Sequence, residues 1–152
     1  MRKILVLGAG KIGALISGLL AESGDYAVAL ADVDGNASAA VAKAHGSERL
    51  TAHAVDATQR KSLDAFLATH KIDAVVSSLP YYCNPVVAAA ARKADAHYFD
   101  LTEDVTVTRA VRRIARGAKR AMPLPVSVPS PPISAAAVTA VLFTVFSHPC
   151  KV

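Results

Sequence analysis

Two hydrophobic patterns alternate along the first 116 residues of this 152-residue chain. Short runs in which nearly every residue is apolar are typical of strands that are buried on both faces of a parallel sheet. Between these runs, apolar residues recur three and four positions apart, as they do on one face of a helix. The alternation predicts an α/β fold with a doubly wound parallel sheet of about five strands. The expected strands are residues 3–7, 27–31, 50–55, 72–78 and 97–101.

The helices expected between these strands have recognisable ends. Gly24 and Gly46 follow two of them, at positions where a left-handed residue commonly ends a helix. Asn84 followed by Pro85 predicts an N-cap and a proline in the first turn of another. Thr102 is the expected cap of the last helix. The expected helices are residues 12–22, 36 to about 45, 58 onward, 84 onward and 102–116.

The composition of the chain changes near residue 120. Six of the eight prolines lie beyond this point, and residues 121–150 contain no Asp, Glu, Lys or Arg. The apolar run 133–146 has 14 residues, fewer than the roughly 20 that span a bilayer. We therefore expect a folded domain over residues 1–120 and a Pro-rich, uncharged, poorly ordered tail over residues 121–152. A membrane anchor formed by the apolar run is the less favoured alternative.

Charge and cysteine content narrow the classes of partner. The net charge is +5, and six of the 17 cations lie between residues 109 and 120, where spacings of three and four place four arginines on one helical face. A solvated face fits better than a nucleic-acid site, because no aromatic residues are interleaved with these cations. Two cysteines, Cys83 and Cys150, do not make a disulfide framework, which favours the cytoplasm. The five histidines lack metal-ligand spacing, so no metal is expected.

The clearest motif is the glycine pattern in KILVLGAGKIG, residues 3–13. Gly8, Gly10 and Gly13 form G-x-G-x-x-G directly after a strand and at the start of a helix. The first glycine permits a tight turn, the second lets a pyrophosphate approach the backbone, and the third lets helix and strand pack closely. The helix N-terminus then offers free N–H groups to the phosphates. This context predicts a Rossmann-like fold that binds a dinucleotide.

An acidic residue stands where such a site needs one. Asp32 lies 19 residues after Gly13, at the end of the second expected strand. A carboxylate there can accept hydrogen bonds from an adenosine ribose, and it repels the 2′-phosphate of NADP. No arginine follows in DVDGN to compensate, so NAD is the preferred cofactor. The alternative is that Asp32 and Asp34 only start a turn.

Three further positions follow expected strands. Asp56 lies where an adenine would rest, and helix capping is an equally good reading of the same residue. The segment 77–80, SSLP, ends the fourth strand beside the topological switch point, where open α/β sheets bind ligands. Cys83 has no base beside it in the sequence, so a packed side chain is favoured over a nucleophile.

Together, the segments ILVLGAGKIG, LADVD, VDAT, VVSSLPYYCNPVVAAAA and HYFDLTEDVTVTRAV resemble the N-terminal NAD(P)-binding domain of the saccharopine dehydrogenase family. The resemblance extends from residue 1 to about 119. It implies a Rossmann domain followed by a second α/β domain that binds substrate and often mediates dimers. It also implies oxidation or reduction of the C–N bond of secondary amines made from an amino acid and an aldehyde or oxo acid.

The resemblance also assigns residues to the cofactor. Gly8, Gly10, Lys11, Ile12 and Gly13 would line the pyrophosphate. Asp32 and Val33 would meet the adenosine ribose, and Asp56 and Ala57 the adenine. Ser78, Leu79 and Pro80 would lie at the nicotinamide. Tyr82 and the loop 100–103 would face the substrate cleft. No catalytic residue is assigned, because most of the substrate-facing groups would belong to the second domain.

The sequence departs from the family pattern after residue 119. We expect a truncated or frame-shifted product that lacks the substrate domain, and the isolated chain is expected to be inactive. An amino-acid-like substrate would then bind only where a second domain is supplied. The alternative function is a non-catalytic dinucleotide-binding module that serves as a sensor or subunit. A homo-oligomer is compatible with either function.

Overall fold

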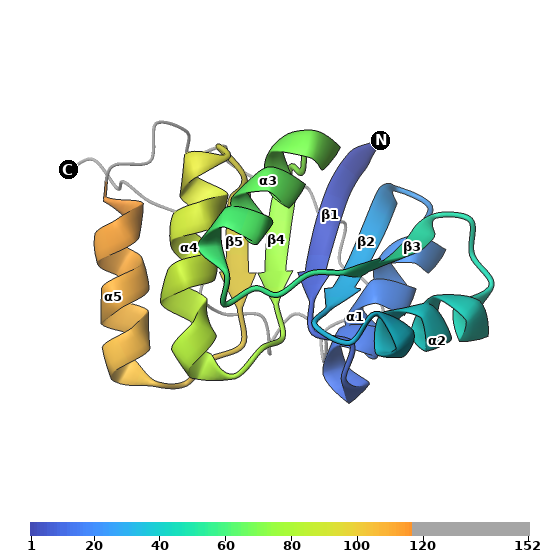
Figure 1. The fold of residues 1–152 in the computed structure, drawn as a ribbon, viewed down its shortest axis with the longest axis horizontal. Helices are drawn as coiled ribbons and strands as arrows, with labels where there is room; N and C mark the ends of the chain where they lie inside the picture. The colour runs from blue at the N-terminus through green and yellow to red at the C-terminus, as the bar shows by residue number, and fades with distance from the viewer. Residues whose placement is uncertain (117–152) are drawn as a thin grey trace, which may run out of the picture.

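The computed structural model describes residues 1–116, which form a single parallel sheet with helices on both faces (Figure 1). The strands are β1 (Arg2–Leu7), β2 (Tyr26–Asp32), β3 (Leu50–Ala54), β4 (Ala74–Ser77) and β5 (His97–Asp100). They lie in the order β3-β2-β1-β4-β5, and every neighbouring pair is parallel. The α/β Rossmann-like fold and the five-strand parallel sheet predicted from the sequence are confirmed.

Within residues 1–116, four α-helices and one short 3-10 helix connect the strands, and a fifth α-helix follows β5. They are α1 (Lys11–Glu22), α2 (Gly35–His45), α3 (Arg60–His70), η1 (Tyr81–Cys83), α4 (Asn84–Lys93) and α5 (Val105–Ala115). Gly46 adopts the left-handed conformation at the end of α2, as the sequence predicts. Gly24, one residue past the Ser23 cap of α1, also has a positive φ.

Two of the expected helix caps are wrong. Asp104, rather than Thr102, caps α5: its carboxylate accepts a hydrogen bond from the Val107 backbone N–H at 2.7 Å. The Thr102 hydroxyl oxygen instead accepts from the Asp104 N–H at 3.2 Å, so Thr102 helps to position the capping residue. Asn84 is the first residue of α4 and lies fully inside the protein, where its amide oxygen accepts from the Ser77 hydroxyl. Asn84 therefore does not cap α4, because its side chain binds Ser77 of β4 instead of the helix backbone.

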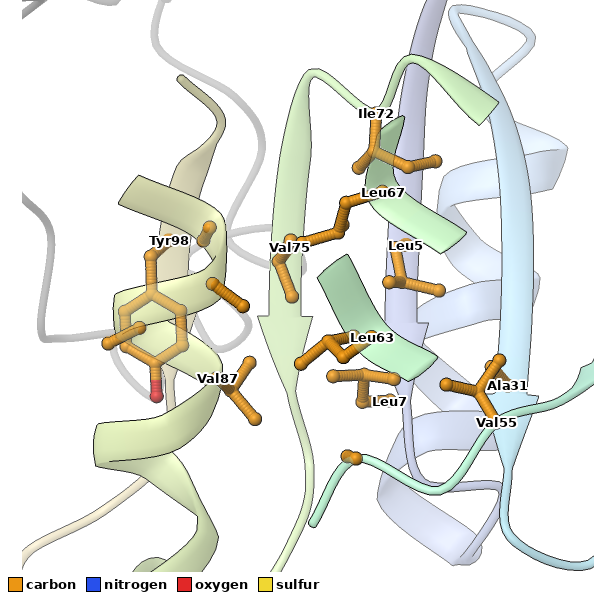
Figure 2. Close-up of a cluster of buried hydrophobic side chains, with 14 of the residues drawn as sticks. Leu5, Leu7, Ala31, Val55, Leu63, Leu67, Ile72, Val75, Val87 and Tyr98 are labelled. Carbon is orange, nitrogen blue, oxygen red and sulfur yellow. The ribbon is translucent and has the colours of Figure 1, made fainter. Parts of the chain in front are cut away.

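The two faces of the sheet carry separate hydrophobic clusters, because successive strand residues point to opposite sides. On one face, Leu5, Leu7 and Val75 pack against α3, α4 and α5 (Figure 2). On the other face, Val6 and Leu30 pack against α1 and α2. Both clusters are built almost entirely from the short apolar runs and periodic stretches recognised in the sequence.

The connections between the strands create a ligand-binding position at the carboxyl ends of β1 and β4. The chain leaves β1 through α1 toward β2 on one side, whereas β4 pairs with β1 on the other. The carboxyl ends of β1 and β4 therefore diverge at a topological switch point, the position where open α/β sheets bind ligands. The loops that carry the glycine motif and the SSLP segment meet there.

Two expectations concern residues beyond 116. The poorly ordered tail and the membrane anchor both fall on residues 121–152, which lie outside the described part of the chain. Within residues 1–116, no helix combines the length and apolar character needed to cross a membrane.

Candidate functional site: a dinucleotide cradle at the switch point

The glycine loop between β1 and α1 is held in place by two neighbouring strands. The Gly8 N–H donates to the Ala31 carbonyl of β2 at 2.8 Å, and Gly8 has a φ of +98°, which favours glycine. A Cβ added at Gly8 would come within 2.8 Å of the Ser78 carbonyl oxygen. The Ser78 N–H in turn donates to the Leu7 carbonyl at 2.8 Å. The loop is thus fixed against the ends of β2 and β4.

The other two glycines differ sharply in their surroundings. A Cβ at Gly13 would lie 1.8 Å from the Gly8 carbonyl oxygen, so this position admits no side chain. A Cβ at Gly10 would meet nothing within 4 Å. Gly13 therefore serves the contact between helix and loop, whereas Gly10 leaves open space above the backbone. Open space at the second glycine is what the approach of a pyrophosphate requires.

The N-terminus of α1 faces the same space. Gly10 is the N-cap residue, and no side chain caps the helix. The first N–H groups of a helix have no partner within it, and they carry the positive end of the helix dipole. Lys11 and Ile12 supply these N–H groups, and both residues are exposed. The residues at this end of α1 thus fit a bound phosphate.

Asp32 joins the ends of β1 and β2. Its Oδ2 accepts from the Ala9 N–H of the glycine loop at 2.7 Å, and its Oδ1 accepts from the Asp34 N–H at 3.0 Å. The carboxylate is half-buried and lies directly beside the loop predicted to hold the pyrophosphate. Each oxygen retains acceptor capacity beyond its single backbone donor. The hydrogen bond from Ala9 is a contact that the sequence analysis missed, because the two residues are 23 positions apart.

The two residues after Asp32 have different roles. Asp34 caps α2, since its side chain accepts from the Asn36 N–H at 2.9 Å. Asp32 and Asp34 therefore both form turns, but Asp32 also accepts from the glycine loop, so the turn-forming alternative does not describe Asp32 completely. Val33 is strongly exposed at the same edge of the sheet.

Asp56 follows β3 and is occupied by its own loop. It accepts from the Thr58 backbone N–H at 2.9 Å, from the Thr58 hydroxyl at 2.6 Å and from Gln59 at 3.0 Å. The hydrogen bonds from Thr58 lower the pKa of Asp56, so the carboxylate is charged at neutral pH. Ala57 is buried in the core and presents no side chain to solvent. Asp56 therefore organises its own loop, and its alternative role as a helix cap is wrong, because Gln59 is the N-cap residue of α3 and no side chain caps this helix.

The segment after β4 lies against the glycine loop. Ser78 and Leu79 are half-buried, and the Leu79 side chain would lie 3.3 Å from a Cβ at Gly8. Pro80 is exposed and precedes η1. Tyr81 and Tyr82 are exposed, with their rings in edge-to-face contact at 5.8 Å between centroids. The structure thus brings the SSLP segment and the glycine motif together, as the sequence predicts for a cofactor site.

A buried polar cluster supports this segment from behind. The Ser77 hydroxyl donates to the Asn84 amide oxygen at 2.8 Å, and both residues are fully buried. Tyr98 and Asp100 lie two positions apart on β5, so their side chains are on the same side of the sheet. Asp100 is the register partner of Ser77 on β4. Burial, followed by the negative charge of Asp100, raises the pKa of the Tyr98 hydroxyl. This cluster was not predicted from the sequence. The polar residues Ser77 and Asp100 within otherwise apolar strands were the signal that could have indicated it.

Cys83 is packed in the interior, as the sequence favours. Burial, followed by the charge of Asp56, raises the pKa of the Cys83 thiol, which opposes the thiolate that a nucleophile needs. Within residues 1–116, no group of three or more His, Cys, Asp or Glu side chains could hold a metal ion. The four arginines of the basic face are exposed along and just beyond α5.

The fold and the loop together define a dinucleotide-binding domain of the Rossmann type. Its parallel sheet, uncapped helix N-terminus and open second glycine lie at one switch point. The family described as Saccharopine dehydrogenase NADP binding domain matches residues 4–125. The chain belongs to this family, which confirms the resemblance seen in the sequence. A search of curated proteins gave no significant match.

Solved structures agree with this assignment. Apo saccharopine dehydrogenase (L-Glu forming) from Saccharomyces cerevisiae is 26% identical, with a TM-score of 0.67 over 76% of this chain and 25% of the yeast chain. A putative myo-inositol dehydrogenase from Sinorhizobium meliloti 1021 is 25% identical, with a TM-score of 0.59 over 76% of this chain and 33% of that one. A myo-inositol dehydrogenase from Corynebacterium glutamicum, at 22% identity and a TM-score of 0.57 over 74% of this chain and 32% of its own, shares the fold. The chain thus spans only a quarter to a third of these proteins.

Proposed function

We propose that this domain holds NAD in preference to NADP and serves an oxidoreductase of the saccharopine dehydrogenase type. The observation that carries the proposal is the Asp32 carboxylate, fixed by the Ala9 N–H beside the open space at Gly10. The pyrophosphate would lie on the loop of Gly8, Gly10 and Gly13 and on the first N–H groups of α1.

The preference for NAD follows from charge. A ribose 2′-hydroxyl would donate to a carboxylate, whereas the 2′-phosphate of NADP would meet its negative charge. Two unit charges 4 Å apart repel by about 4 kcal/mol at the effective dielectric constant of a protein surface. Residues 33–37 contain no Lys or Arg, and Asp34 adds a second acid. The family is named for NADP, so the proposed preference for NAD rests only on Asp32 and the residues beside it in this chain.

The other proposed cofactor residues would form only the cofactor side of an active site. Asp56 and Ala57 would lie near the adenine, and Ser78, Leu79 and Pro80 near the nicotinamide. A bound nicotinamide supplies hydride transfer, and the protein orients the substrate and manages protons. We infer that the substrate is an amino-acid-derived secondary amine whose C–N bond is oxidised or formed. Its binding groups would come from a second domain, and two cysteines without a disulfide framework favour the cytoplasm.

Fluorescence titration of the purified chain with NADH and NADPH tests the cofactor proposal. We expect NADH to bind at least about tenfold more tightly, equivalent to about 1.4 kcal/mol. The neutral variant Asp32→Asn should lose most of this discrimination, and Asp25→Asn, an exposed acid before β2, is the matched control. Tighter binding of NADPH by the unaltered chain would refute the preference. Failure of both ligands to bind would refute the cofactor site itself.

A further inference from the structure

Helix α1 presents an apolar surface to solvent. Ile12, Leu15 and Leu19 are 51%, 57% and 43% exposed, respectively. With the half-buried Ile16 and Leu20 they recur at intervals of three and four, so they form one stripe along the helix. An apolar stripe of this kind normally faces a packed neighbour. Here Ile12, Leu15 and Leu19 face away from the sheet, whereas Ile16 and Leu20 pack against its hydrophobic cluster.

The sheet cannot accept these side chains, because α1 approaches it through small residues. The buried positions of the helix are Gly13, Ser17, Gly18 and Ala21. A Cβ at Gly18 would clash with the His45 ring of α2 at 2.1 Å. Close packing on this side therefore uses the small residues and leaves Ile12, Leu15 and Leu19 on the opposite side.

A hollow continues the apolar stripe onto the sheet. Its volume is about 810 Å³, and it lies at the amino ends of the strands, away from the glycine loop. Ile16 and Leu20 of α1 line it together with Val76 of β4 and Phe99 of β5. Among the described elements, α4 is the principal helix against β4 and β5, and it packs on the other face of the sheet. The face of β4 and β5 beside α1 thus forms a continuous apolar surface with the stripe.

We propose that residues 133–146 of the same chain cover this surface. The run contains no charged residue, so its burial against the stripe leaves no unpaired charge. Ala115, at the end of α5, lines the same hollow from the side of α3 and α4, so the described part of the chain ends at the rim of this hollow. Most charged residues of the hollow lie at the ends of α3 and α4 or near the starts of strands, whereas Asp64 lies within α3 and pairs with Arg60 and Lys93.

Lengths are compatible with this arrangement. Residues 116–132 can span up to about 56 Å when extended, so the linker does not restrict where the run can reach. Fourteen residues measure about 21 Å as a helix and about 46 Å as an extended chain. The 12 residues of α1 measure about 18 Å. In either conformation the run is long enough to follow the whole stripe.

Photo-crosslinking of the full chain tests the proposal without reference to any cofactor. The photoreactive residue p-benzoylphenylalanine replaces Leu19, and a second preparation carries it at Leu15. Val105, which is 61% exposed at the start of α5, is the control position. Trypsin releases residues 121–151 as one peptide, because no Lys or Arg lies between Arg120 and Lys151. Mixing ¹⁵N-labelled and unlabelled chains separates crosslinks within one chain from those between two.

We expect crosslinks from position 19 to the peptide 121–151, within single chains. Their yield should exceed that from position 105 at least about five-fold, because the tether brings the segment near both positions and only docking on the stripe holds it at position 19. Crosslinks between labelled and unlabelled chains would overturn the proposal and assign the surface to a second copy. Equal yields at positions 15, 19 and 105 would also overturn it and would agree with a poorly ordered tail. A circular dichroism spectrum matching that of the unaltered chain establishes that each preparation is folded.

Discussion

Alanine replacement of Gly10 and Gly13 separates the two roles of the glycine loop. The two glycines lie three positions apart and receive the same added methyl group. At Gly13 the new Cβ would lie 1.8 Å from the Gly8 carbonyl oxygen, whereas at Gly10 it would meet nothing within 4 Å. Gly10 also has a φ of −68°, which alanine adopts without strain. The first change strains the fold and the second obstructs only a ligand.

The magnitudes follow from these contacts. Real Cβ contacts stay beyond 3.0 Å, so Gly13→Ala must move the loop carbonyl by about 1.2 Å. Gly8 is itself wedged against the Ser78 carbonyl, which leaves little room for that movement. Overpacking of this kind costs about 1–3 kcal/mol, equivalent to a decrease in Tm of about 4–12 °C. Gly10→Ala instead restricts the unfolded chain and should stabilise the fold by about 0.4–1 kcal/mol.

Thermal unfolding with and without NAD measures both effects. At 100 times its dissociation constant, NAD should stabilise the unaltered domain by about 2.7 kcal/mol. Gly10→Ala should slightly raise the Tm of the free protein and lose most of the shift with NAD, with at least about tenfold weaker binding. Gly13→Ala should lower the Tm before any ligand is added. Equal loss of stability in both variants, or full NAD binding by Gly10→Ala, would refute the assignment of Gly10 to the phosphate path.

Two further predictions concern stability. Asp104→Ala removes the acceptor of the Val107 N–H and should cost about 1 kcal/mol in urea unfolding, because the cap of α5 is lost. Asp64 pairs with Lys93 and with Arg60, each at 2.8 Å, and these hydrogen bonds lower the pKa of Asp64 below 3.8. Its stabilisation is therefore complete above pH 3.8 and disappears as the carboxyl protonates at lower pH. Asp64→Asn should lower stability by up to about 1 kcal/mol at pH 7, and this effect should decrease as the pH falls below 3.8.

Controls for these two changes come from the same elements. Thr106→Ala, in the first turn of α5, alters an exposed side chain and should leave stability nearly unchanged. A comparable loss from Thr106→Ala would contradict the capping role of Asp104. For Asp64, the difference between variant and unaltered protein isolates one carboxyl, because the others titrate equally in both. A difference that persists undiminished at pH 2 would contradict the ionic origin of the stabilisation.

Local sequence determined the elements and the position of the glycine loop. The apolar runs that predict the strands do so because a strand buried on both faces consists mainly of apolar residues. Asp34 and Gly46 bound α2 through hydrogen bonds and backbone angles that involve their immediate neighbours. Gly8, Gly10 and Gly13 could be assigned because their spacing relative to a strand and a helix is itself the requirement. Each of these features depends on residues within a few positions of one another.

Only the tertiary structure decided how distant residues share the site. Asp32 accepts from Ala9, and Asn84 turns inward to Ser77 instead of capping its helix, because the strand order places β2 and β4 on either side of β1. The same packing directs the small residues of α1 toward the sheet and leaves Leu15 exposed. The hydrophobic period of the helix reveals an apolar stripe, but not which surface it faces. That choice depends on the space between helix and sheet, which no single segment of the sequence encodes.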